Sequence, residues 1–369
     1  MMHIMLASVL IFFLVLSILV VVHEFGHYWV AKRNGILVEE FGFGIPPRIY
    51  GKKIGETVYS INLLPFGGFV RLHGEASEEG LTDPTRAFVN KSKKVRIAVI
   101  IAGVVMNLAL AVVCFSIVYS FLGITRESGK VKIVDIQPDT PAASSQLVIG
   151  DVIKSVNGKK VMKTEDVINE VVDRGGKHNL ILDSNGVEKK AILDTRQSPT
   201  DSKWYMGVVL TSTEVYFPPV WQRPFYGVYY GVVNSYRTTK TVVMSLFGAV
   251  SEASRGKAPE GTVGPVGLLG LVDYVRKLGI LPLVDFIGLI SINLAVINIL
   301  PFPALDGGRL LFIFIEKLIG RKVLPKVEAA IHSVGMIILL ILLFSITIKD
   351  VRGVISAGGI SGFINSLVK

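Results

Sequence analysis

The sequence has a single cysteine, Cys114, among 369 residues. A disulfide within the chain is therefore impossible, and a zinc site built from several cysteines is excluded as well. Any metal would have to be held by histidine and carboxylate side chains. Charged residues are also scarce, at 18% of the chain against about 25% in ordinary soluble domains. No nucleic-acid-binding motif accompanies the net charge of +10, so we expect no nucleic-acid partner.

The sequence contains several long apolar runs. Half of the residues are hydrophobic and the mean hydropathy is +0.54, values typical of proteins that cross a membrane several times. The runs predict four transmembrane helices, within residues 1–35, 97–122, 284–306 and 333–349. The first run lacks the basic start and the small-residue cleavage site of a signal peptide, so we expect it to remain as a helix. The expected fold class is a polytopic α-helical membrane protein.

Basic residues flank these spans and predict which ends face the cytoplasm. Lys32 and Arg33 follow the first span, and further lysines and arginines lie in residues 76–96 and 307–332. Because cytoplasmic loops are enriched in such residues, we expect both of these loops to be cytoplasmic and both termini to be outside. The same positive charge predicts contact with anionic lipids.

The first apolar run leads directly into His23-Glu24-Phe25-Gly26-His27. Histidines four residues apart project from one helix face and can share a Zn²⁺ ion, with Glu24 beside it as the base for a water molecule. The alternative is a polar helix end without a metal. Two histidines and a glutamate at a membrane span favour function, because ionisable residues are costly there.

Asp306 is the candidate third ligand. One span separates the first and third spans, so these two helices run in the same direction across the membrane. His23 and Asp306 lie at similar distances along them and should reach the same end. Two imidazoles and a carboxylate leave a fourth zinc position open, as catalytic sites require. The alternative for Asp306 is an acid in a helix-breaking turn.

Asn107, in the second span, is more simply explained as a contact between helices.

The segments between spans have other patterns. Residues 36–75 contain two β-prone pieces interrupted by glycine and proline, which predicts a membrane-associated β-region or a surface β-unit. Residues 123–212 alternate strand-like and helix-like segments, with Asn157-Gly158 and Asn185-Gly186 as tight turns. Residues 213–283 predict an amphipathic interfacial helix over 218–250 and a glycine-rich loop over Gly261–Gly270, and 350–369 form a tail.

Taken together, these motifs resemble a known family. Gly150-Asp151-Val152-Ile153 with Val156-Asn157-Gly158 resembles a PDZ domain. His23-Glu24-x-x-His27 and Asn298-x-x-Pro301-x-Pro303-x-Leu305-Asp306-Gly307 resemble the site-2 protease family of intramembrane zinc metalloproteases, in its bacterial regulator-of-sigma-E protease branch. Two features differ: there is room for only one PDZ domain, and Val104 stands where members often have proline.

The resemblance implies zinc ligands at His23, His27 and Asp306 and a catalytic base at Glu24. It also implies that Asn298 helps to hold an unwound substrate, for which Asn293 and Pro301 are further candidates. Residues 57–72 would present the substrate as an added strand.

The implied activity is zinc-dependent cleavage of single-span membrane proteins, such as anti-sigma factors or remnant signal peptides, after an upstream protease has trimmed them. The protein would lie in a bacterial inner membrane, with its active site near the cytoplasm and an extracytoplasmic PDZ-like domain that binds a peptide end or acts as a size filter. The alternatives are a non-catalytic PDZ scaffold that binds chain ends and a metal transporter, which would need more polar residues in its spans.

Overall fold

The structure is a computed structural model that describes residues 2–75, 81–172, 175–197, 204–255, 263–321 and 323–368. Internal contacts divide the chain into two compact units. Unit 1 comprises Met1–Phe121 and Pro224–Lys369, and unit 2 comprises Leu122–Arg223. Parts of the expected loops at 76–96, 261–270 and 307–332 lie outside the described residues, as do two short stretches of the expected PDZ-like domain, 173–174 and 198–203.

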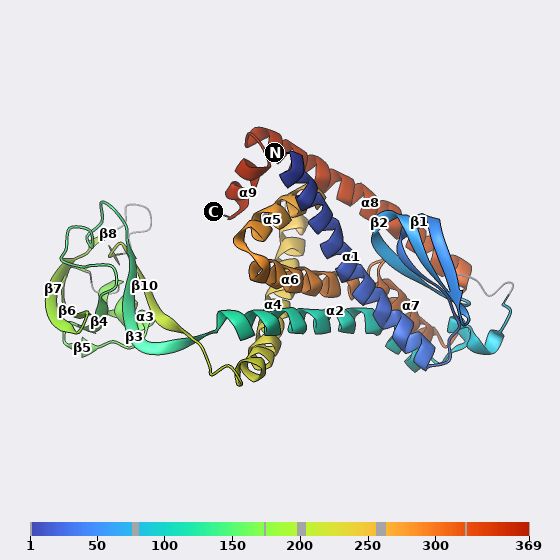
Figure 1. Ribbon diagram of the computed structural model, residues 1–369, viewed down its shortest axis with the longest axis horizontal. Coiled ribbons are helices and arrows are strands. Elements are labelled where there is room, and N and C mark those ends of the chain that lie inside the picture. Colours follow the sequence, from blue (N-terminus) through green and yellow to red (C-terminus); the bar gives the residue numbers. More distant parts are fainter. Residues whose placement is uncertain are drawn as a thin grey trace. The chain divides into compact units, whose positions relative to one another are not determined.

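The described residues of unit 1 form mainly helices, together with one sheet. The helices are α1 (Met2–Arg33), α2 (Lys93–Leu122), α4 (Arg223–Ser254), α5 (Pro265–Leu278), α6 (Ile280–Asn298), α7 (Asp306–Ile319), α8 (Pro325–Ser356) and α9 (Ile360–Val368), with 3-10 turns at Pro84–Arg86 and Phe88–Asn90. The sheet is formed by β1 (Val38–Ile54) and β2 (Thr57–Leu72), which lie beside α1 (Figure 1).

Within the described residues, four helices are long and apolar enough to cross a bilayer. They are Leu6–Arg33, Lys93–Leu122, Ile280–Asn298 and Lys326–Ser356. These helices correspond to the four apolar runs of the sequence, although the third ends at Asn298, before the turn that leads to Asp306. Helix α4 is not among them. It packs against α2 where Gly227 and Gly231 come close to Ser120 and Ser116.

The sheet of unit 1 has more segments than its two strands suggest, because each strand pairs in two places. Residues 38–43 pair with 68–72 on one side, and residues 40–43 pair with 58–61 on the other. Residues 48–54 of β1 pair with the start of β2. Residues 68–72 therefore form an edge of this sheet. A cluster of buried residues joins the sheet to the helices around it: Ala31, Ile36, Val38, Leu72, Phe88, Val99, Ile100 and Ile313.

Glu56, in the turn between the two strands, anchors the sheet to the end of α1. Its carboxylate accepts hydrogen bonds from Arg86 Nη2 at 2.7 Å and from Lys32 Nζ at 2.9 Å. These bonds, with Arg86 contributing most, lower the pKa of Glu56 to about 2.

The predicted glycine-rich loop over Gly261–Gly270 is wrong in its second half, because α5 begins at Pro265. Proline suits the first position of a helix, where its missing N–H has no partner to lose. The buried Asp350 carboxylate accepts a hydrogen bond from the Gly267 N–H at 2.7 Å. A side chain at Gly270 would collide with Ile364 of α9. The glycines therefore serve helix packing, not a loop.

In the part of unit 2 that the structure describes, a small set of sheets is accompanied by one helix, α3 (Thr164–Val172). Its strands are β3 (Ile124–Ile136), β4 (Val152–Val156), β5 (Lys159–Lys160), β6 (Lys177–Ser184), β7 (Val187–Asp194), β8 (Arg196–Gln197), β9 (Trp204–Tyr205) and β10 (Val208–Tyr216). The main sheet has the order β10-β3-β4-β6-β7, all antiparallel. Asn185 and Gly186 both have positive φ, as a two-residue hairpin turn of type I′ requires.

Candidate metal centre

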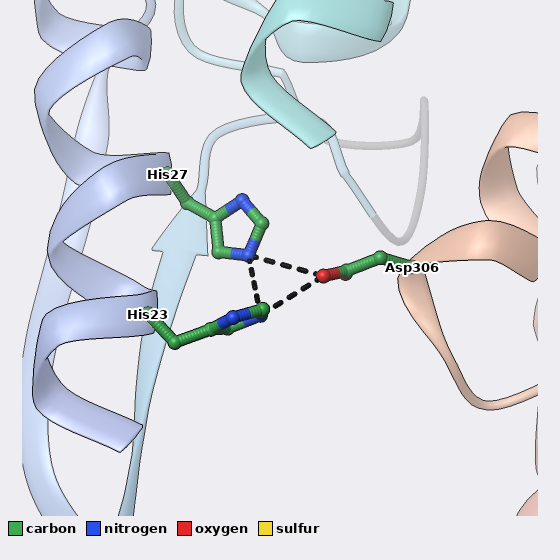
Figure 2. Close-up of side chains that lie close together, drawn as sticks. All are labelled: His23, His27 and Asp306. Atoms are coloured by element: carbon green, nitrogen blue, oxygen red, sulfur yellow. Dashed lines mark hydrogen bonds and ion pairs between the residues drawn. The ribbon is translucent and has the colours of Figure 1, made fainter. Parts of the chain in front are cut away.

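Helix α1 carries both histidines of the HExxH motif on one face. His23 is buried, and His27 lies one turn further along the helix. Asp306 is the first residue of α7, 279 residues later than His27 in sequence (306 − 27), and its carboxylate faces both rings (Figure 2). The structure thus joins the two motifs that the sequence analysis connected by depth in the membrane.

The three side chains are close enough to share one ion. His23 Nε2 and His27 Nε2 are 3.2 Å apart, and Asp306 Oδ2 lies 3.0 Å from the first and 3.3 Å from the second. Ligands bound to zinc at about 2.1 Å in a tetrahedron are about 3.4 Å from one another. The observed triangle is within a few tenths of an ångström of that spacing. The donor set, two imidazoles and one carboxylate, is also one that zinc accepts.

Helix α2 closes one side of the cluster at Gly103. A β-carbon at this position would lie 2.5 Å from His27 Nε2 and 2.7 Å from His23 Nε2. Real β-carbons do not approach other atoms so closely, so only glycine leaves the facing nitrogens free. Gly26 of α1 has the same function at the helix crossing, because a side chain there would collide with the Ala102 carbonyl oxygen at 2.4 Å.

The turn before α7 sets the position of Asp306. Gly307 and Gly308 approach the backbone of residues 299–303 so closely that a β-carbon would meet carbonyl oxygens at 2.1 Å and 2.5 Å. Ala304 has φ of +79°, a strained value for a residue with a side chain. Its N–H donates to His332 Nδ1 of α8 at 2.9 Å. Sequence analysis did not identify His332, which lies beside the start of an apolar run and belongs to no motif.

Two cavities meet at the cluster. The larger, of about 700 Å³, is bordered by β2, α7 and α8, and Glu24, His27 and Asp306 line it. The smaller, of about 200 Å³, includes His23 and Asn298. Glu24 and Asp306 line both cavities. Glu24 thus lies beside the three donor atoms and borders a cavity on each of two sides.

The larger cavity also contains an ion pair that the sequence did not indicate. Arg309 of α7 donates to the Glu75 carboxylate, and both side chains line the cavity. The negative charge of Glu75 raises the pKa of Arg309, so the guanidinium stays charged.

The remaining predicted site residues differ in their placement. Asn298 lies at the end of α6 with Nδ2 3.2 Å from His23 Nε2, so the structure brings it to the cluster. Asn293 is one and a half turns earlier and donates to the Leu289 carbonyl of its own helix. Pro301 lines a separate cavity beside α2 and α7. We therefore carry Asn298 forward as a site residue, and not Asn293 or Pro301.

The sequence is similar to known proteins over most of its length. A protein of Clostridium acetobutylicum, whose name provisionally assigns it zinc metalloprotease activity, is 35% identical over 349 residues, which cover 93% of this chain and 97% of that protein. The regulator of sigma-W protease RasP of Bacillus subtilis is 28% identical over an alignment of 424 positions, gaps included. The alignment covers 94% of this chain and 98% of RasP.

Among solved structures, the PDZ domain of an SdrC-like protein from Listeria innocua is 15% identical and covers 24% of this chain and 99% of its own length, with a TM-score of 0.21. A score at that level does not establish a common fold, so the PDZ-like character of unit 2 remains a prediction.

Residues 11–342 match Peptidase family M50. This match and the relatives leave no support for a non-catalytic scaffold. The chain belongs to Peptidase family M50, the site-2 proteases, and is a zinc-dependent intramembrane metalloprotease.

Proposed function

We propose that this protease cleaves single-span membrane proteins within or beside their transmembrane segments, with His23, His27 and Asp306 as zinc ligands and Glu24 as the catalytic base. One observation carries the proposal. Three donor atoms from α1 and α7 converge at 3.0–3.3 Å from one another, and α1 and the adjacent α2 are both long enough to cross a membrane. A charged cluster in such surroundings is costly and is retained for function.

The division of roles follows from the chemistry of the side chains. Zinc at this position supplies a Lewis acid for peptide hydrolysis. Glu24 lines both cavities and is placed to take a proton from the attacking water and to pass it to the leaving amine. Asn298 lines the smaller cavity, where its amide can hydrogen-bond an unwound substrate backbone.

The exposed edge of the sheet supports the proposal that the substrate binds in an extended conformation. Residues 68–72 of β2 pair with β1 on one side only, and no other described strand covers the outer side. A β-carbon at Gly68 would lie 3.6 Å from Glu24 Cγ, and Phe69 and Val70 line the larger cavity. An added strand at this edge would hold the substrate backbone next to Glu24. Transmembrane helices must unwind to be cut, because helical amides are already hydrogen-bonded internally.

The same sheet exposes apolar side chains that support contact with the bilayer: Ile45, Ile49, Tyr50, Ile54, Ile61, Leu63 and Leu64. We therefore retain the membrane-associated β-region as a proposal. Lys32 and Arg33 at the end of α1 support a metal centre near the cytoplasmic side of a bacterial inner membrane, and they support contact with anionic lipids. Unit 2 is then extracytoplasmic and either binds a peptide end or limits substrate size.

The Bacillus subtilis relative is named as a regulator of sigma-W, which supports a substrate that controls a sigma factor. We expect that substrate to be a single-span protein already trimmed outside the membrane by another protease.

The test is cleavage of such trimmed proteins by the purified full chain in lipid vesicles, with products identified by mass spectrometry. Glu24→Gln should retain zinc and lose cleavage by at least 100-fold, within the range of general acid–base catalysis. Glu188→Gln, an exposed glutamate of unit 2, is the matched control and should cleave normally. Cleavage by the Glu24 variant at the wild-type rate would contradict the proposal.

A further inference from the structure

Three positions of α2 form a single line beside the metal centre. Val99, Gly103 and Asn107 are spaced four residues apart, so they share one face of the helix. Val99 and Asn107 each approach one histidine of α1, and Gly103 lies between them against both rings. One helix therefore contacts the side of each imidazole that faces away from Asp306.

The contact to His27 fixes which ring nitrogen is available. His27 Nδ1 lies 2.8 Å from the Val99 carbonyl oxygen, which can only accept a hydrogen bond. Nδ1 must therefore carry the proton, which leaves the lone pair of a neutral ring on Nε2. That atom is the one that faces His23 and Asp306. Metal-binding histidines generally have an acceptor of this kind on their other nitrogen.

The contact to His23 is made by an amide instead of a carbonyl. Asn107 is completely buried, and its Nδ2 lies 3.2 Å from His23 Nδ1. In this orientation the amide donates and Nδ1 accepts, so a neutral ring carries its proton on Nε2, which faces Asp306 at 3.0 Å. The Asn298 amide nitrogen, 3.2 Å from the same Nε2, could not then donate to it. With its proton on Nε2, the ring would have no lone pair to offer a metal at that atom.

The other end of the amide resolves the conflict. Asn107 Oδ1 is buried and has no hydrogen-bond partner. The two ends of an amide are nearly the same size, so a half-turn about the Cβ–Cγ bond would bring Oδ1 to His23 Nδ1. Oδ1 would then accept the Nδ1 proton, and Nε2 would be free for the ion. Ser291 of α6 donates to the Asn107 backbone carbonyl at 2.8 Å and holds this point of α2 in place.

We propose that Asn107 is a positioning residue that holds His23 in its metal-binding tautomer, as the Val99 carbonyl does for His27. The inference rests on the zinc ligands of the proposed function. It assigns a specific role to an asparagine that the sequence analysis treated as a contact between helices.

The test is the zinc affinity of the full chain in detergent, measured by competition with a chelator. Asn107→Leu, which cannot hydrogen-bond, should raise the zinc Kd by about 10–100-fold. Asn107→Asp supplies an acceptor only, so its Kd should stay within about threefold of the wild type or fall below it. Cobalt substitution gives a second readout, since the Asp variant should keep the wild-type absorption spectrum and the Leu variant should not.

The control is Val113→Ala, a change at an exposed side chain of the same helix, six residues beyond Asn107, and it should leave the zinc Kd unchanged. A folded Leu variant that binds zinc as tightly as wild type would overturn the inference. An Asp variant weakened by tenfold or more would also overturn it, even if the Leu variant does not fold. Failure of the wild type itself to bind zinc would instead refute the proposed function.

Discussion

Replacing Gly103 by alanine tests the geometry of the metal centre with one methyl group. The new β-carbon would lie 2.5 Å from His27 Nε2 and 2.7 Å from both His23 Nε2 and His23 Cε1. Since ordinary contacts begin near about 3.4 Å, the rings or the helix must shift by roughly 1 Å. Metal sites tolerate only about 0.2 Å in ligand distance. We therefore expect zinc affinity and cleavage both to fall by at least 100-fold.

The assay is zinc content by mass spectrometry after dialysis against a weak chelator, together with cleavage in vesicles. Gly248→Ala is the matched control, because a β-carbon at Gly248 in α4 meets nothing within 4 Å. Circular dichroism shows whether each variant has kept its helices. A folded Gly103→Ala protein with one zinc ion and normal cleavage would refute the proposed position of the ion.

Three further predictions concern metal dependence, the turn before α7 and the sheet. A strong chelator should abolish cleavage and added zinc should restore it; activity that persists in metal-free protein would contradict a zinc mechanism. His332→Leu should leave the Ala304 N–H unpaired at a cost of about 1–3 kcal/mol and reduce cleavage, whereas His332→Asn, with an acceptor at a similar position, should recover part of it. Equal cleavage by all three proteins would show that this bond is unimportant. The pKa of Glu56 is lowered to about 2 on folding, so its pairs stabilise the protein above the unfolded pKa near 4.5 and lose that effect as pH falls towards 2. Glu56→Gln should therefore lower the melting temperature at pH 6 and have little effect near pH 2, where the wild type has lost the same pairs; a difference independent of pH would contradict this account.

The sequence predicted most of what depends on local pattern. The four apolar runs appear as long helices, and Asn157-Gly158 and Asn185-Gly186 adopt the positive φ values of tight turns. His23 and His27 could be paired from their spacing alone, since helical geometry fixes which face they share. Asp306 could be proposed as a ligand because its distance from the start of the third apolar run, like that of His23 from the start of the first, can be counted along the sequence.

Features that arise from packing could not be predicted in this way. Helix α5 was missed because glycines at Gly264, Gly267 and Gly270 are typical of a loop, and only the neighbouring helices show why small residues are needed there. The role of Gly103 at the metal centre could not be predicted for the same reason. Its role depends on where α2 crosses α1, which no local pattern encodes.

Asn298 and Asn293 both lie on α6, and sequence alone could not separate the one that reaches His23 from the one that bonds within its own helix.

The most direct test of the central claim is X-ray absorption at the zinc edge on the full-length Glu24→Gln protein. The account predicts one zinc ion per chain, bound by two imidazole nitrogens and by oxygen, with loss of the ion when Asp306 is replaced by alanine. A protein without zinc, or a zinc signal without imidazole that persists in the Asp306 variant, would contradict it.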